Sequence, residues 1–208
     1  MQADLITLSR EYGAGAGDLA QRLGAALGWP VLDAGIPLAV AQRLGIPEDS
    51  LDEWDEHAPN FLESVGNALL LGSPEILIDP EYARRPVARE VADATRAVLL
   101  ELTATPPVIV VGHGAQVLLG DRPRTLHLRL VAPIEERARR VMDRRRCSGQ
   151  EAIAICDSVD RDRVHYVQQF LHRDVRDPLL YAMQINTGIV SMDDAVRLVS
   201  ALLADEPA

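Results

Sequence analysis

The stretch that decides the fold is "LITLSREYGAGAGDLAQRL", residues 5–23. The apolar run that opens it predicts a buried strand, and the helical spacing after it predicts a helix that ends at Leu27. Gly13, Gly15 and Gly17 lie at the junction of the two, where the helix begins at about Gly15. Glycines at such a junction let successive backbone amides point inward, which is how a loop cradles phosphate at a helix N-terminus. The alternative is a tight turn in which glycine only permits close packing.

The loop departs from the usual phosphate-binding pattern GxxxxGK[ST]. Only Gly15 matches it, because Arg10, Ala16 and Gly17 stand where glycine, lysine and a hydroxyl are expected. All 21 basic residues of the chain are arginines, so any ionic contact with phosphate must come from arginine. Arg10 directly follows the buried strand, where charge is costly unless something uses it. We therefore expect Arg10 to supply the missing cation.

We predict that the turn itself binds nucleotide phosphates. Asp18 suits the positive end of the helix dipole, and a second interpretation has it hold Mg²⁺ through water. Otherwise Mg²⁺ is expected to arrive on the nucleotide, without a direct side-chain ligand. The residues predicted to lie at the phosphates are Tyr12, Gly13, Ala14, Gly15, Ala16, Gly17 and Asp18.

Composition limits the classes of partner. A net charge of −10 argues against a general nucleic-acid binder, because phosphate backbones demand a basic face. The apolar run at 106–112 is far shorter than the roughly 20 residues of a membrane span. Cys147 and Cys156 form no metal-binding pattern, which favours reduced thiols in a cytoplasmic protein. The expected partners are small-molecule nucleotides, neither nucleic acid nor membrane, with a homodimer as an open expectation.

Strands and helices alternate along the chain, which predicts a doubly wound parallel α/β sheet in three layers. We expect a single domain over 1–208, with a candidate acceptor-side insertion at 46–80 and a candidate lid at 144–176. The predicted strands are 5–9, 30–33, 108–112, 125–132 and 183–187. The predicted helices are 15–27, one ending near 44, 60–71, 87–102, one starting at 133, 149–171 and one capped by Ser191.

Polar groups end three of the predicted strands. The glycine loop follows the first, Asp33 ends the second, and "GHG" at 112–114 follows the third. Ligands of such sheets bind beyond the carboxyl ends of the strands, so these features are expected to meet at one site.

The segment "ITLSREYGAGAGDLAQRLGAALGWPVLD" closely resembles the opening of the cytidylate kinase-like family of P-loop NTPases, whose loop also lacks the lysine. The resemblance continues through "VIVVGHGAQVLLGDRP" (108–123), "LVAPIEERARRVMDR" (130–144) and "DPLLYAMQINTG" (177–188). It covers nearly the whole chain with the motifs in order. It implies a P-loop, nucleotide kinase-like fold with a helical lid, ATP and Mg²⁺ as cofactors, and phosphoryl transfer.

The same resemblance implies roles for individual residues. "LDAG" (32–35) is similar to the monophosphate-site segment of cytidylate kinases and puts Asp33 at the acceptor. "CDSVDRDR" (156–163) is similar to their lid motif, with Cys156 in place of its first arginine. Arg161 and Arg163 are then expected to clamp the transferring phosphates. Asp157 and Asp160 are expected to orient arginines or the pyrimidine.

His113 replaces the arginine that family members usually carry after the third strand. A histidine that is mostly neutral near pH 7 holds phosphate less firmly, so the acceptor's identity stays open. His113 is expected either to face the acceptor or simply to start a helix with a hydrogen bond to backbone.

Three further groups have simpler interpretations. Asn186 and Thr187 end the last strand, where the adenine of a donor nucleotide rests in this fold. The six arginines within 137–146 are mostly a solvated helix face, with one or two expected to close over phosphates. His127 and Arg129 are interpreted as polar strand positions and not as ligands.

The sequence thus predicts a nucleotide kinase-like enzyme that transfers phosphate from ATP·Mg²⁺ to CMP or a related small acceptor. Phosphoryl transfer needs alignment and charge neutralisation more than covalent help. The alternative is a weakly active or inactive nucleotide-binding sensor, favoured by Ala16 at the lysine position and by His113.

Overall fold

Five parallel strands form one sheet in a computed structural model that describes residues 2–33, 35–45 and 88–204. The strand order is β2-β3-β1-β4-β5. This arrangement confirms the predicted doubly wound parallel sheet. The strands are β1 (Leu5–Arg10), β2 (Val31–Leu32), β3 (Val108–Val111), β4 (Thr125–Val131) and β5 (Met183–Asn186).

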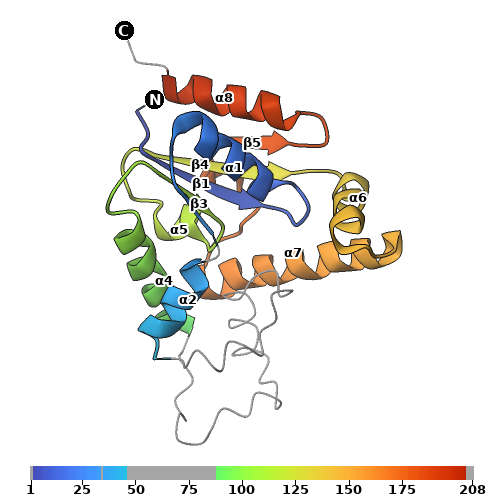
Figure 1. Cartoon of the computed structure of the whole chain (residues 1–208). Coiled ribbons are helices and arrows are strands. Elements are labelled where there is room, and N and C mark those ends of the chain that lie inside the picture. The colour runs from blue at the N-terminus through green and yellow to red at the C-terminus, as the bar shows by residue number, and fades with distance from the viewer. Residues whose placement is uncertain (1, 34, 46–87, 205–208) are drawn as a thin grey trace, which may run out of the picture.

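Helices cover both faces of the sheet, as Figure 1 shows, with α1 and α8 above it and α4 and α7 below it. The helix α6 connects the end of β4 to α7. The helices are α1 (Ala16–Leu27), α2 (Gly35–Arg43), α4 (Ala88–Leu102), α5 (Ala115–Leu118), α6 (Ile134–Arg145), α7 (Gly149–Leu171) and α8 (Met192–Ala204), with a 3₁₀ turn, η3, at Pro178–Leu180.

Strand β1 is buried on both faces because its side chains alternate between two hydrophobic cores. Leu5 packs in the core with α2, α4 and α7, whereas Ile6 and Leu8 pack in the core with α1 and α8. The strand pairs with β3 on one side and with β4 on the other. A central strand held in this way fixes the position of the glycine turn that follows it.

The long helix α7 is anchored in two places. Its first half joins α6 in a third apolar cluster that includes Tyr12 from the glycine turn. Its second half carries Tyr166 and Phe170 into the core, with ring centroids 5.2 Å apart. Ser148 caps the helix in a reciprocal pair with Glu151. The predicted lid segment is thus packed along the body of the fold.

Most of the predicted elements are found within a few residues of their expected ends. Strand β2 is shorter than expected, with only Val31 and Leu32 paired to β3. The insertion predicted at 46–80 and the helix predicted at 60–71 lie outside the described residues. No helix in the described part of the chain is long and apolar enough to cross a membrane.

Candidate functional site

The glycine turn is built around left-handed backbone that only glycine adopts without strain. Gly13 has φ +82° and Gly15 has φ +89°. A Cβ at Gly13 would lie 2.8 Å from the carbonyl oxygen of Arg137 in α6, so the turn also packs closely. The packing alternative raised by the sequence therefore holds at Gly13, and it does not exclude a ligand role for the rest of the turn.

Two of the amides predicted to bind phosphate already have partners in the chain. The amide of Tyr12 donates to Oδ1 of Asp160 (2.7 Å), and that of Ala14 donates to the carbonyl of Glu11 (3.1 Å). Helix α1 starts at Ala16, and its first amides have no carbonyl within the helix to bind. The amides at the start of α1 are thus the ones best placed for an anion.

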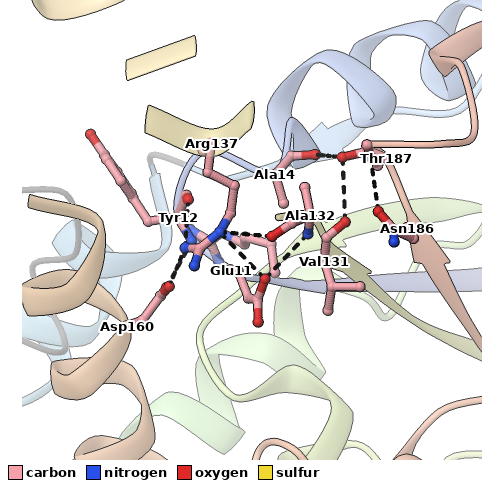
Figure 2. A network of polar contacts seen from close by, with 12 residues as sticks. Glu11, Tyr12, Ala14, Val131, Ala132, Arg137, Asp160, Asn186 and Thr187 are labelled. Carbon is pink, nitrogen blue, oxygen red and sulfur yellow. Dashed lines mark hydrogen bonds and ion pairs between the residues drawn. The ribbon is translucent and has the colours of Figure 1, made fainter. Parts of the chain in front are cut away.

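Arg137 ties the turn to α6 and α7, as Figure 2 shows. Its Nη1 donates to the carbonyl of Tyr12 (3.1 Å) and to Oδ2 of Asp160 (2.5 Å), and its Nε donates to the carbonyl of Ala132 (3.0 Å). Glu11 completes the group, because its Oε2 accepts from the amide of Ala132 (3.2 Å) and lies 3.5 Å from Nε of Arg137. A buried arginine with these partners positions the turn.

A second arginine of α6 braces the other end of the turn. Nη1 of Arg140 donates to the carbonyl of Gly13 (3.2 Å) and to Oγ1 of Thr187 (2.9 Å). The hydroxyl of Thr187 in turn donates to the carbonyl of Ala14 (2.8 Å). Asn186 accepts the amide of Gly188 with its side-chain oxygen (2.9 Å). Of the two residues predicted at the adenine, Thr187 thus braces the glycine turn, while the side chain of Asn186 binds the chain just after β5.

A cavity of about 1090 Å³ opens over the turn. Three guanidinium groups surround the Tyr12 ring in the wall of this cavity. Their central carbons lie 5.2 Å (Arg144), 5.7 Å (Arg163) and 5.9 Å (Arg145) from the ring centroid. Such a concentration of positive charge suits an anionic ligand. The residues lining this loop cavity include Arg10, Gly13, Gly15, Ala16, Gly17, Asp18, Asp33, Arg140, Arg144, Arg145 and Arg163.

A second cavity of about 760 Å³ adjoins the first. Arg10, Glu11 and Arg163 line both, so the two cavities meet at the carboxyl end of β1. We call the second one the acceptor cavity because it is lined by His113, for which a position at the acceptor is one of the two expectations from the sequence. It is lined among others by Ser9, Gly112, His113, Gly114, Arg129, Arg137, Asp157, Asp160, Arg161, His165 and Arg176.

Arg10 lies against the backbone at the end of β3. A Cβ at Gly112 would fall 1.6 Å from its Nη1, so a side chain at this position would displace the guanidinium. Gly112, His113 and Gly114 all have positive φ, at +81°, +58° and +68°. For His113 this conformation is strained, and strained backbone of this kind is concentrated at functional sites.

His113 and Asp33 face each other at the ends of β3 and β2. Nε2 of His113 donates to the carbonyl of Asp33 (3.1 Å) and lies 3.8 Å from its Oδ1. Burial lowers the pKa of His113, and the charge of Arg10 lowers it further, against the opposite effect of Asp33. Burial alone would raise the pKa of Asp33, but His113 and Arg10 hold it below its ordinary value. At neutral pH the pair is therefore a neutral imidazole beside a carboxylate.

Most of the predicted site residues line one of the two cavities. The turn, except for the buried Ala14, lines the loop cavity together with Asp18, and Asp33, which the sequence predicted at the acceptor, lines this cavity too. His113, Asp157, Asp160 and Arg161 line the acceptor cavity, Arg10 and Arg163 line both, and Asn186 and Thr187 line neither. The sequence did not identify Arg137 and Arg140 as the braces of the turn. The polarity of an arginine on an amphipathic helix gives no sign that its side chain is buried.

The carboxylate of Asp18 is 2.8 Å from Nε of Arg22 and is half exposed. Within the described residues, no group of three or more His, Cys, Asp or Glu side chains is arranged to hold a metal ion. The open amides and the arginines at the loop cavity fit a triphosphate that brings its own Mg²⁺.

Solved structures of low identity share this fold. An uncharacterized protein from Eubacterium ventriosum aligns with a TM-score of 0.67 and 16% identity, over 98% of this chain and 99% of that chain. TT1252 from Thermus thermophilus aligns with a TM-score of 0.56 and 20% identity, over the full length of both chains. Shikimate kinase from Bacteroides thetaiotaomicron aligns with a TM-score of 0.51 and 12% identity, over 96% of this chain and 98% of that chain.

No curated protein is a significant match. The model of the cytidylate kinase-like family, in contrast, matches residues 5–189, a range that holds the glycine turn and both cavities. The resemblance seen in the motifs is therefore confirmed, and the chain belongs to the cytidylate kinase-like family.

Proposed function

We propose that the protein binds ATP·Mg²⁺ in the loop cavity and transfers its γ-phosphoryl group to a small acceptor, CMP or a related molecule, in the acceptor cavity. The observation that carries this proposal is the junction of the two cavities. Arg10 and Arg163 line both, so two cations lie where a phosphoryl group would pass from donor to acceptor.

In this proposal the chain neutralises the charge of the phosphates and aligns the ATP with the acceptor. Arg163 is held in place because its Nη1 donates to the carbonyl of Arg10 (3.2 Å) and lies 3.7 Å from Oδ1 of Asp160. Arg144 and Arg145 would neutralise the outer phosphates, and the amides at the start of α1 would bind the inner ones. Preorganised donors of this kind stabilise a transition state more than they stabilise a flexible ground state.

The acceptor would contact His113 in the acceptor cavity, and Asp33 would face it across His113 from the wall of the loop cavity. A neutral His113 offers hydrogen bonds rather than charge, which suits a hydroxyl or a base edge better than a second phosphate. Arg161 and Asp157, on the exposed side of α7, would close the outer wall. Kinases of this type use ATP bound to Mg²⁺. Since ATP is available in the cytoplasm, we propose that the protein acts there.

The test separates binding from turnover. Calorimetry with ATP·Mg²⁺ is expected to show binding, which Arg144→Met weakens about tenfold through the loss of one phosphate contact. Arg139→Met is the matched control, because Arg139 is 62% exposed and pairs with Glu136 on the outside of the same helix.

Turnover is measured as ADP formation with a panel of nucleoside monophosphates and other hydroxyl acceptors. Product formed by the wild type and lost in Arg163→Met and Arg163→Lys supports the kinase. Binding of ATP without product for any acceptor supports the nucleotide-binding sensor instead. No binding of any nucleotide at millimolar concentration would refute both.

A further inference from the structure

A buried arginine in the sheet forms no ion pair with any carboxylate that the structure describes. Arg129, in β4, is only 5% exposed and lines the acceptor cavity. Its Nη1 donates to Oγ of Ser9 (3.3 Å), and its guanidinium carbon lies 5.8 Å from the centroid of the Tyr181 ring. Among the described residues its partners are these two neutral groups, and no carboxylate forms an ion pair with it.

A charge in this position is costly. Removing an arginine from water costs several kcal/mol unless a nearby opposite charge offsets it, and buried arginines are accordingly paired in most proteins. Arg137 in the same cavity shows the usual solution, because Asp160 and Glu11 neutralise it. Of the three buried arginines that line this cavity, Arg137 and Arg163 pair with Asp160, whereas Arg129 pairs with no carboxylate of the described residues.

One carboxylate that feels the charge of Arg129, that of Asp174, is already bound to another arginine. Asp174 binds Arg176 with both oxygens, at 3.0 and 3.2 Å. Hydrogen bonds from Arg176 are the main cause of the lowered pKa of Asp174, and the charge of Arg129 adds a smaller effect. A carboxylate held in this way on the surface does not replace a direct partner for Arg129.

The surroundings hold the Arg129 side chain in one orientation. Ser9 is its register partner on β1, and the hydroxyl of Tyr181 lies 3.2 Å from Oγ of Ser9 and donates to the carbonyl of Val175 (2.7 Å). One of the five guanidinium N–H groups is used by Ser9, so most of the planar fork is left for a ligand. That fork matches the two oxygens of a carboxylate or phosphate.

We propose that Arg129 binds the anionic group of the acceptor, a phosphate or a carboxylate, from the sheet side of the acceptor cavity. This inference rests on the proposed function, because it names a residue that would recognise the acceptor in the same cavity. Its basis is a buried cation that, among the described residues, only neutral groups contact, in a cavity large enough for a small ligand.

The binding test needs no nucleotide. Inorganic phosphate and malonate are titrated separately into the wild-type protein, Arg129→Met and Arg144→Met, and binding is measured by calorimetry. We expect the wild type to bind at least one of the two anions, at least ten times more tightly than Arg129→Met does. That binding should persist in Arg144→Met, which removes a cation from the loop cavity only. The preferred anion identifies the group.

A second measurement covers the case in which Arg129→Met does not fold. The Nε–H resonance of Arg129, assigned by comparison with Arg129→Lys, is expected to shift on titration of wild-type protein with the bound anion. Arg197→Met, an exposed change on α8, is the matched control and should leave binding unchanged.

Three results would overturn the inference. They are equal affinity in wild type and Arg129→Met, a wild type that binds neither anion, and an Arg129 resonance that stays fixed through the titration. Each of them leaves ATP binding in the loop cavity untouched. Conversely, anion binding at Arg129 without ATP binding would remove the proposed function and leave the anion site.

Discussion

The guanidinium of Arg137 and the carboxylate of Asp160 form a 2.5 Å ion pair that joins α6 to α7 at the glycine turn. Both groups also bind the backbone of Tyr12, Arg137 at its carbonyl and Asp160 at its amide. One residue of the turn is thus held from both sides by a single ion pair, so the shape of the turn depends on two distant helices.

Arg137→Met should therefore destabilise the fold. It removes the close partner of the partly buried Asp160 carboxylate, which keeps only the longer 3.7 Å contact with Arg163, and losing one member of such a pair costs up to about 3 kcal/mol. Thermal or urea unfolding measures this. Arg139→Met, on the exposed side of the same helix, should change stability by less than about 0.5 kcal/mol. Equal effects of the two variants would show that the ion pair is not structural.

Gly13→Ala and Gly17→Ala should separate folding from binding. Alanine at Gly13 must adopt φ +82° and meet the Arg137 backbone, at a cost of about 2 kcal/mol or more. A Cβ at Gly17 meets nothing within 4 Å, so that variant should be as stable as the wild type or gain up to about 1 kcal/mol.

Of these two variants, Gly17→Ala is the one that tests ATP binding. The open space at Gly17 belongs to the loop cavity, so its new methyl group should weaken ATP binding in calorimetry while the fold is preserved. A Gly17→Ala protein with unchanged ATP affinity would argue that phosphate binds elsewhere.

Stability should depend on pH through His113. Its pKa is lowered in the folded state, so as the pH falls through about 6.5 the unfolded chain takes up a proton that the folded protein excludes. Folding stability therefore decreases in this range, by at most about 1.4 kcal/mol per pH unit for one group. His113→Gln should have a smaller slope between pH 7 and about 5.5, measured by urea unfolding. Identical slopes would contradict the burial of a neutral imidazole.

Thr187→Val should loosen the turn from the side of β5. Valine has nearly the same shape but loses the hydroxyl that donates to Ala14 and accepts from Arg140. We expect a loss of about 1–2 kcal/mol in unfolding and weaker ATP binding. Thr125→Val is the control, because the hydroxyl of Thr125 makes only a 3.5 Å contact with Pro123. A wild-type ATP affinity in Thr187→Val would limit this residue to stability.

The sequence predicts the fold well because the relevant signals are local. The alternation of β1 between two cores, the left-handed glycines and the helical periodicity of α4 follow from neighbouring residues. Strand β2 was expected to be longer, since "PVLD" reads as extended chain, but only two of its residues pair with β3. Pairing depends on the partner strand, which a local pattern does not contain.

The site is only half visible in the sequence. Motif resemblance drew attention to Arg163 and His113, yet it gave no sign that Arg137 is buried or that Arg129 pairs with no carboxylate of the described residues. Both properties depend on which distant segments the fold brings within reach. Arg129 was interpreted as an ordinary polar strand position, because one arginine in an alternating strand looks the same whether it faces solvent or a cavity.

Arg10 and Arg163 belong to the walls of both cavities, and this sharing has a thermodynamic consequence. An anion in either cavity changes the field that the same two cations present to the other. Occupancy of one cavity must then alter the dissociation constant measured at its neighbour. Linkage requires that the factor be identical in the two directions.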